Sequence, residues 1–215
     1  MTKAEVLALA NDEQQEAIQH QEGACMIIAG PGSGKTKTVV SRTQYMILNG
    51  VDPSQICLFT FTNKAANEMK ERVKKAVGDC ADKITCGTYH SVAHRLLRRY
   101  ATHIGFNKNF TILSPDDCKK ILKRIGKERN VDPDNLAVYI SSKKDKVISP
   151  QKALLSAFTE PEKIMANAYI SYQDELKRQM AMDFDDLIIF TIILLENNPD
   201  IKQRINNQWR YITAK

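Results

Sequence analysis

The chain has 215 residues, of which 43% are hydrophobic, which is enough for one α/β domain or two small ones. Its formal net charge is +6 and its pI is near 9.0, values that fit a polyanion-binding surface. It contains no run near the roughly 20 apolar residues that span a bilayer, and the first 20 residues, with Asp12 and Glu13, do not resemble a signal peptide, which predicts a cytoplasmic protein without a membrane partner. Five cysteines without a C-x-x-C pair argue against a disulfide framework.

The most informative segment follows the first apolar run. Residues 25–29 predict a buried strand, and residues 29–36 read Ala-Gly-Pro-Gly-Ser-Gly-Lys-Thr. This is the Walker A arrangement, in which glycines let backbone N–H groups and a helix N-terminus surround phosphates. We therefore expect the loop to bind a nucleoside triphosphate with Mg²⁺. Its catalytic residues would be Lys35, which bridges the β and γ phosphates, and Thr36, which holds the metal. The predicted nucleotide-binding residues here are Ala29, Gly30, Pro31, Gly32, Ser33, Gly34, Lys35 and Thr36.

Strands and helices alternate over the first hundred residues. The pattern predicts a parallel sheet with helices on its faces. Each strand ends in a polar turn at its carboxyl edge, which is where open α/β sheets bind ligands. The expected helices cover 35–48, before the cap signal Asn49-Gly50, and 63–77, before Gly78; the expected strands cover 56–61 and 84–86.

From about residue 110 the pattern becomes helical. Ser114 and Pro115 open a basic amphipathic helix, as N-cap and first helical residue. Helices are expected over about 115–129, 160–181 and 184–197, joined by turns at 132–135 and 149–150. We interpret residues 110–182 as a helical subdomain inserted into a first domain made of 1–109 and 183–215. Residues 209–213 look like the sheet resuming, and the chain then stops at Lys215, which suggests truncation ahead of a catalytic acid.

Several strings around the loop are similar to motifs of one enzyme family. Residues 11–18 resemble its L-N-x-x-Q-x-x-A motif, with Ala10 in place of leucine, and residues 59–69 resemble its motif Ia. Residues 87–91, Gly-Thr-Tyr-His-Ser, resemble motif Ib with Tyr89 in place of phenylalanine. Residues 182–188 resemble its M-D-F-D-D-L segment. In these strings and their spacing the chain resembles the UvrD/Rep/PcrA-like group of superfamily 1 DNA helicases.

The resemblance implies a RecA-like P-loop motor domain that binds ATP and Mg²⁺. Gln14 then recognises adenine, and single-stranded DNA or a single-strand/duplex junction is the partner. It further implies 3′-to-5′ translocation and unwinding by the parent protein, and it does not identify which proteins, if any, are partners. The family's Val-Asp-Glu-x-Gln-Asp string is replaced by Ala214 and Lys215, so we expect this fragment alone to bind weakly and not to unwind. The implied DNA-binding residues are Phe61, Thr62, Asn63, Thr88, Tyr89 and His90.

Alternative interpretations remain at this point. Another P-loop enzyme, such as a small-molecule kinase, or a DNA-binding module without catalysis would share the loop or the basic charge. Phe61 by itself fits an ordinary core aromatic, although the resemblance favours DNA contact. The carboxylates at 183, 185 and 186 are close enough to suggest a metal, but Asp183 also fits a helix cap, and we assign them structural or coupling roles.

Overall fold

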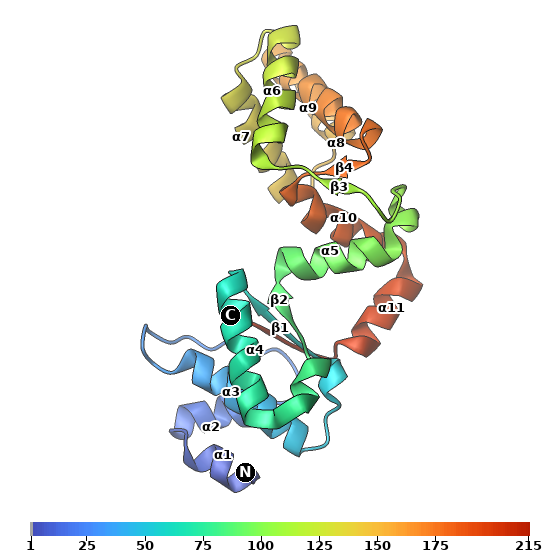
Figure 1. The fold of residues 1–215 in the computed structure, drawn as a ribbon. Helices are drawn as coiled ribbons and strands as arrows, with labels where there is room; N and C mark the ends of the chain where they lie inside the picture. Colours follow the sequence, from blue (N-terminus) through green and yellow to red (C-terminus); the bar gives the residue numbers. More distant parts are fainter. Residues whose placement is uncertain (1) are drawn as a thin grey trace. The chain divides into compact units, whose positions relative to one another are not determined.

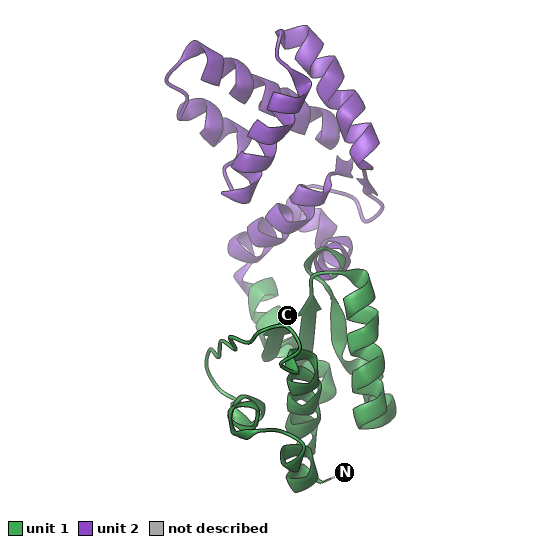
Figure 2. Cartoon of the chain, turned by 90° about the vertical axis from the view of Figure 1, so that its left-hand side faces the viewer, with its two compact units in different colours: residues 1–91, 200–215 green, residues 92–199 purple. Residues whose placement is uncertain are grey.

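The computed structural model describes residues 2–215. The chain divides into two compact units: unit 1 is the chain up to Ser91 together with Asp200–Lys215, and unit 2 is Val92–Pro199 (Figure 2). These boundaries differ from the expected insertion at 110–182, because residues 92–109 and 183–199 pack with the helices of unit 2. Assignment of those residues to a motor domain remains a prediction.

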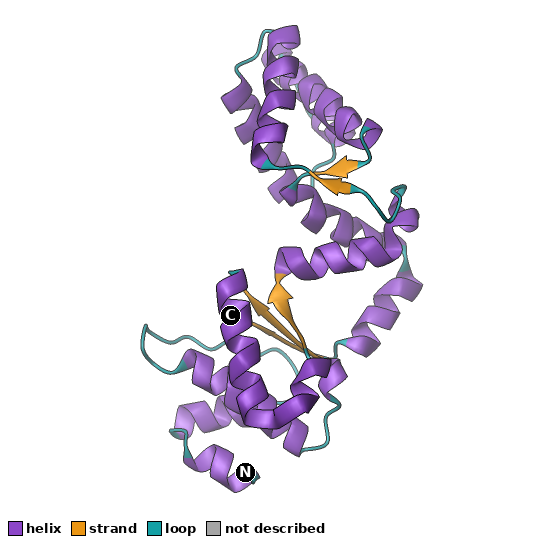
Figure 3. Cartoon of the chain, in the orientation of Figure 1, coloured by secondary structure: helices purple, strands orange, loops and turns teal. Residues whose placement is uncertain are grey.

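The centre of unit 1 is a parallel sheet with strand order β2-β1-β5 (Figure 3). Its strands are β1 Ile56–Thr60, β2 Thr85–Thr88 and β5 Tyr211–Ala214. Cys57 pairs with Thr85 on one side and with Ile212 on the other. The sheet expected from the alternating pattern is thus present, and the architecture is α/β with a small parallel sheet.

Helices cover this sheet and supply its core. Thr62 accepts a hydrogen bond from the Ala65 N–H at 3.1 Å and so caps α4, which ends where Gly78 adopts a φ of +73°. Val39 of α3 and Met69 of α4 are buried with Leu58 of β1. The helices expected over 35–48 and 63–77 are confirmed. The helices of this part of the chain are α1 Lys3–Ala8, α2 Asp12–Gln19, α3 Lys35–Leu48, α4 Asn63–Val77 and α11 Pro199–Gln208, with 3-10 turns η1 Pro53–Gln55 and η2 Gly78–Lys83 (Figure 1).

The strand expected at 25–29 is not formed, and that prediction is wrong. Met26 and Ile28 are 84% and 87% exposed. A strand is held by hydrogen bonds to a neighbour, and among the described strands none pairs with this segment. A cavity of about 570 Å³, lined by residues 23–27, 212–215 and part of α3, separates the segment from β5. Apolar composition alone did not reveal that the ladder partner is missing.

Unit 2 is helical. The expected N-cap is confirmed at α6, where Ser114 accepts from the Asp117 N–H. The turns expected at 132–135 and 149–150 instead begin two helices, because Asp132 and Ser149 are N-caps followed by proline at the first helical position. The elements are α5 Tyr89–Tyr100, η3 Ala101–Ile104, β3 Thr111–Ile112, α6 Pro115–Arg129, α7 Pro133–Asp145, α8 Pro150–Leu155, α9 Glu160–Arg178, β4 Ala181–Met182 and α10 Phe184–Asn197.

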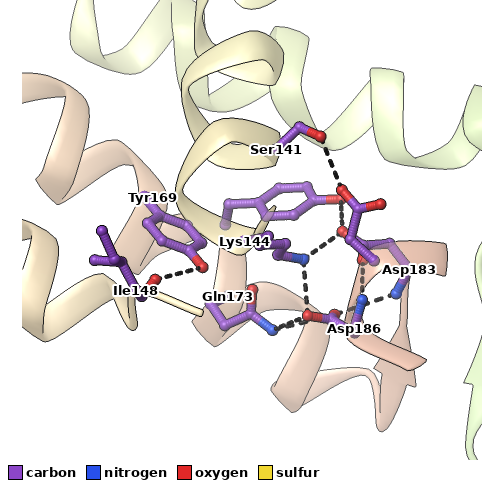
Figure 4. A network of polar contacts seen from close by, with 9 residues as sticks. Ser141, Lys144, Ile148, Tyr169, Gln173, Asp183 and Asp186 are labelled. Atoms are coloured by element: carbon purple, nitrogen blue, oxygen red, sulfur yellow. Dashed lines mark hydrogen bonds and ion pairs between the residues drawn. The ribbon is translucent and has the colours of Figure 1, made fainter. Parts of the chain in front are cut away.

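A buried ion cluster joins three of these helices (Figure 4). The Lys144 ammonium on α7 lies 2.6 Å from an Asp183 oxygen and 2.7 Å from an Asp186 oxygen, and its side chain is 1% exposed. The Tyr172 hydroxyl on α9 donates to Asp183 at 3.0 Å, and the Gln173 amide donates to Asp186. Asp183 is also the N-cap of α10, as expected, which gives these carboxylates a structural role.

Two opposing effects set the protonation of this cluster. Burial alone would lower the pKa of Lys144, but Asp186 and Asp183 raise it above its ordinary value. Burial raises the pKa of Asp186 to about 6 against the opposing charge of Lys144, and Asp183 adds to the rise. With both carboxylates ionised the buried cluster carries one net negative charge, which uptake of a single proton removes.

In the part of the chain that the structure describes, none of the helices combines the length and the apolar character that crossing a bilayer requires.

Candidate nucleotide and DNA site

The phosphate-binding loop lies at the N-terminus of α3. Gly32 and Gly34 have φ values of +79° and +85°, the left-handed region that side chains with a Cβ rarely adopt. Gly34 is the N-cap of α3, and no side chain accepts from the first amides of that helix. Those N–H groups and the positive end of the helix dipole together form an anion-binding terminus.

Lys35 is held against the loop by main-chain oxygen atoms. Its ammonium donates to the carbonyls of Ala29 and Gly30, both at 2.6 Å. Carbonyl groups are neutral, so the positive charge of Lys35 stays uncompensated by these partners and adds to that of the helix terminus. The loop and Lys35 therefore provide both the donors and the charge that a polyphosphate requires.

Thr36 lies next to the carboxyl end of β5. Its hydroxyl accepts a hydrogen bond from the Lys215 ammonium, and the Lys215 N–H donates to the Phe59 carbonyl of β1 at 2.9 Å. The carboxyl ends of β1 and β5 therefore lie beside the phosphate-binding loop. A threonine hydroxyl is a hard oxygen donor of the kind Mg²⁺ accepts, so the residue expected to hold the metal fits that role chemically.

The structure brings Gln14 to the same loop. Gln14 forms a capping box with Asn11 at the start of α2, and its side-chain amide donates to the Ser33 carbonyl at 3.0 Å. A Cβ added at Gly34 would lie 3.1 Å from that amide nitrogen, which shows how closely the two segments approach. The glutamine and the loop expected to share a nucleotide are neighbours, although 19 residues separate Gln14 from Ser33.

The residues that follow β1 form an exposed turn. Phe61 is 90% exposed, which excludes the core-aromatic interpretation within this fold. Thr62 is the N-cap of α4 and Asn63 its first residue. An exposed ring at the ligand edge of a sheet, followed by a helix N-terminus, suits a stacked base and its phosphate.

The polar turn expected after the neighbouring strand, β2, is not formed, because β2 ends at Thr88 and α5 begins at Tyr89, so the exposed residues here belong to the first turn of a helix. Thr60 of β1 is in register with Thr88 of β2, so the residues that follow the two strands lie at the same edge of the sheet. The ring of Tyr89 stacks on that of Phe59 with centroids 4.6 Å apart and is about half exposed. His90 is exposed. Thr88 is buried, and its hydroxyl accepts from the Ser91 N–H, so its side chain is hydrogen-bonded to the first turn of α5.

Comparison with known proteins identifies the family. The family model of the UvrD/REP helicase N-terminal domain matches residues 10–214. This chain belongs to that family. It is 42% identical over 208 residues to the ATP-dependent DNA helicase PcrA of Staphylococcus aureus (strain NCTC 8325 / PS 47) and 41% identical to that of Staphylococcus epidermidis (strain ATCC 12228 / FDA PCI 1200). Each match covers 94% of this chain but 28% of the relative, so the chain spans less than a third of the relatives' length.

The family resemblance drawn from the motifs is therefore confirmed, while the role of each single residue in this UvrD/REP-type domain remains a prediction. Sequence reasoning missed two basic residues of α3 that hold α2 and the segment just before it in place. The Lys37 ammonium donates to the Leu9 carbonyl at 2.6 Å, and the Arg42 guanidinium donates to the Ala17 carbonyl at 3.0 Å. Neither pair has a sequence signature, because a main-chain carbonyl accepts regardless of its residue type.

Proposed function

We propose that this chain is the N-terminal, ATP-binding part of an ATP-dependent 3′-to-5′ DNA helicase. The longer protein would couple ATP hydrolysis to translocation along single-stranded DNA and to duplex unwinding. Membership of the UvrD/REP helicase N-terminal domain family supports this, as does the likeness to proteins named ATP-dependent DNA helicase PcrA. The observation that carries the proposal is the hydrogen bond from Gln14 to Ser33, because it joins an adenine-recognising group to a phosphate-binding loop.

In this proposal residues 29–36 hold the triphosphate of ATP. The Gln14 amide recognises the adenine edge, Lys35 contacts the β and γ phosphates, and the Thr36 hydroxyl is a ligand of Mg²⁺. Bound Mg²⁺ supplies charge neutralisation at the phosphates. The fold that carries these groups is a RecA-like motor domain formed by residues 1–109 and 183–215, with residues 110–182 as an inserted helical subdomain.

The DNA partner is single-stranded DNA or a single-strand/duplex junction in the cytoplasm. Phe61 and Tyr89 offer rings for base stacking at the sheet edge, and Thr62, Asn63, Thr88 and His90 lie beside them, where β1 leads into α4 and β2 leads into α5. Because the chain spans 28% of its relatives, we assign unwinding to the longer protein. The 215-residue chain alone should bind nucleotide and DNA weakly and hydrolyse ATP near the background rate.

The test is the ATPase rate of the longer protein with and without single-stranded DNA. We expect stimulation by an oligo-dT strand and its loss in Lys35→Ala. A rate that responds to a small phosphate acceptor, but not to DNA, would indicate a small-molecule kinase. DNA binding that is unaffected by ATP analogues and by Lys35→Ala would indicate a non-enzymatic DNA-binding module. Either outcome would overturn the proposal.

A further inference from the structure

Helix α2 is short, and its position determines where Gln14 lies. It has eight residues, Asp12–Gln19, so it makes little more than two turns. Its capping box fixes the first turn locally, but capping does not determine where the helix lies on the domain. Packing of its buried residues Ala17 and Ile18 contributes to that position, together with three hydrogen bonds. The bonds from Gln14 to Ser33 and from Arg42 to Ala17 hold α2 itself, and the bond from Lys37 to Leu9 holds the segment just before it.

The bond from Arg42 has the strongest physical basis of the three. The last four carbonyls of a helix lack partners within the helix, and the negative end of its dipole attracts a cation. Ala17 is in the last turn of α2, and its carbonyl accepts from the Arg42 guanidinium at 3.0 Å. Ala17 and Ile18 are buried, so this end of α2 is packed as well as hydrogen-bonded.

Arg42 and the phosphate-binding loop belong to the same rigid element. Lys35 is the first residue of α3, and Arg42 follows it by seven residues, about two helical turns. The acceptor of the Arg42 hydrogen bond, Ala17, lies on α2 three residues after Gln14, which is less than one helical turn. Helix α3 therefore sets the distance between the loop at its N-terminus and the glutamine on α2.

We propose that Arg42 is a positioning residue for adenine recognition, acting through the Ala17 carbonyl to hold Gln14 against the phosphate-binding loop. The proposal rests on the proposed ATP site. Arg42 touches neither Gln14 nor the loop in any hydrogen bond described above, so its effect should appear in the choice of base. Affinity for the triphosphate, which the loop and Lys35 provide, should be retained.

The test compares Arg42→Met, Arg42→Lys and Gln14→Ala in this chain, with Arg72→Met on the exposed face of α4 as the matched control. Two quantities are measured: the binding of fluorescent ATP and GTP analogues, and the NMR signal of the Gln14 side-chain amide. We expect Arg42→Met to lower the preference for ATP over GTP about fivefold, since the interaction that is weakened is the neutral hydrogen bond between the Gln14 amide and adenine. Affinity for the GTP analogue should stay within about twofold, and the Gln14 amide signal should move toward that of a solvated amide.

The conservative variant separates positioning from a general loss of structure. Arg42→Lys keeps a cation near the Ala17 carbonyl and should restore at least half of the lost preference, while Arg72→Met should behave as the wild type. An Arg42→Met variant with unchanged preference, or with equal loss for both nucleotides, would overturn the inference and leave the ATP site standing. A wild-type chain that binds neither nucleotide would overturn the proposed function and this inference together.

Discussion

Two lysines in this chain differ in the charge of the oxygen atoms that they contact. Lys35 of unit 1 donates to two neutral carbonyls of its own loop, beside helix amides that no side chain caps. Lys144 of unit 2 lies between two carboxylates with its side chain 1% exposed. The contacts of Lys35 leave its positive charge unpaired, whereas Lys144 is a buried cation between two carboxylates.

The partners of a charged side chain distinguish a binding site from a structural cluster. A charge that serves a ligand must remain electrostatically uncompensated, because only then does an incoming anion gain from it. A buried charge must be paired, because removing an ion from water costs several kcal/mol. The partners of a lysine therefore indicate its role better than its presence does. Four substitutions test this difference between the surface site and the buried cluster.

The largest effect is expected from Lys144→Met. The change leaves Asp183 and Asp186 buried without their cation, and breaking such a pair costs about 3–5 kcal/mol of unfolding free energy. Urea unfolding followed by circular dichroism measures it, with Lys119→Met on the exposed face of α6 as the control. A loss below about 1 kcal/mol would show that the cluster does not depend on the cation.

Substitution of Lys35 by methionine should have little effect on stability and a large effect on nucleotide binding. Lys35→Met should change the unfolding free energy by less than about 1 kcal/mol, because carbonyl partners at a solvated loop can bind water instead. It should weaken binding of a fluorescent ATP analogue about 100-fold, through loss of a charge-assisted contact of about 3 kcal/mol. Equal loss of stability in Lys35→Met and Lys144→Met would remove the distinction between the two sites.

Exposed rings allow a similar contrast. Phe61 at the sheet edge is 90% exposed, and Phe158 in unit 2 is 89% exposed, so neither substitution by alanine should destabilise the fold. Loss of one stacked base costs about 1–3 kcal/mol. We expect Phe61→Ala to weaken oligo-dT binding about 5- to 100-fold by fluorescence anisotropy and Phe158→Ala to leave it unchanged. Equal effects would contradict the assignment of the DNA edge.

The smallest effect concerns pH. Because burial raises the pKa of Asp186 to about 6, the folded state binds this proton more tightly than the unfolded state. Its stabilising contribution is thus complete below the unfolded value near 4 and is lost as pH rises through about 6. The wild type should gain on the order of 1 kcal/mol, relative to Asp186→Asn, between pH 7.5 and 5.5.

Comparison with Asp186→Asn is needed because His94 acts in the other direction. Burial, and then Arg98, lower the pKa of His94, so its contribution is lost as the pH falls. Both proteins contain His94, and the difference between them isolates Asp186. Parallel stability curves for the two proteins from pH 5.5 to 7.5 would contradict the description of the buried cluster.

Local signals in the sequence were sufficient for much of the fold. Thr62 and Gly78 mark the two ends of α4, and Ser114 with Pro115 marks the start of α6, because caps act on neighbouring amides. Strand order likewise predicts an exposed polar turn after β1, which is present, and one after β2, where the chain instead enters α5 directly. The family resemblance added what local physics does not contain, namely the expectation that Phe61 faces solvent.

Non-local partners could not be predicted. Residues 25–29 have the composition of a strand but no ladder neighbour among the described strands. The residue types at Asp132 and Ser149 favour a turn, but each is equally suited to the N-cap that it forms. Lys144 and Asp183 are 39 residues apart, and Arg42 and Ala17 are 25 apart, so only the folded chain shows these contacts.

The most direct test of the central claim is an NMR titration of the ¹⁵N-labelled chain with AMP-PNP and Mg²⁺. We expect shifts of the backbone amide signals of residues 29–30 and 32–37 and of the Gln14 side-chain amide. The signals of the buried cluster, Lys144, Asp183 and Asp186, should remain unchanged, because its one cation already lies between two carboxylates and has no free charge to offer a phosphate. Shifts that spare residues 29–36, or that are centred on the buried cluster, would contradict it.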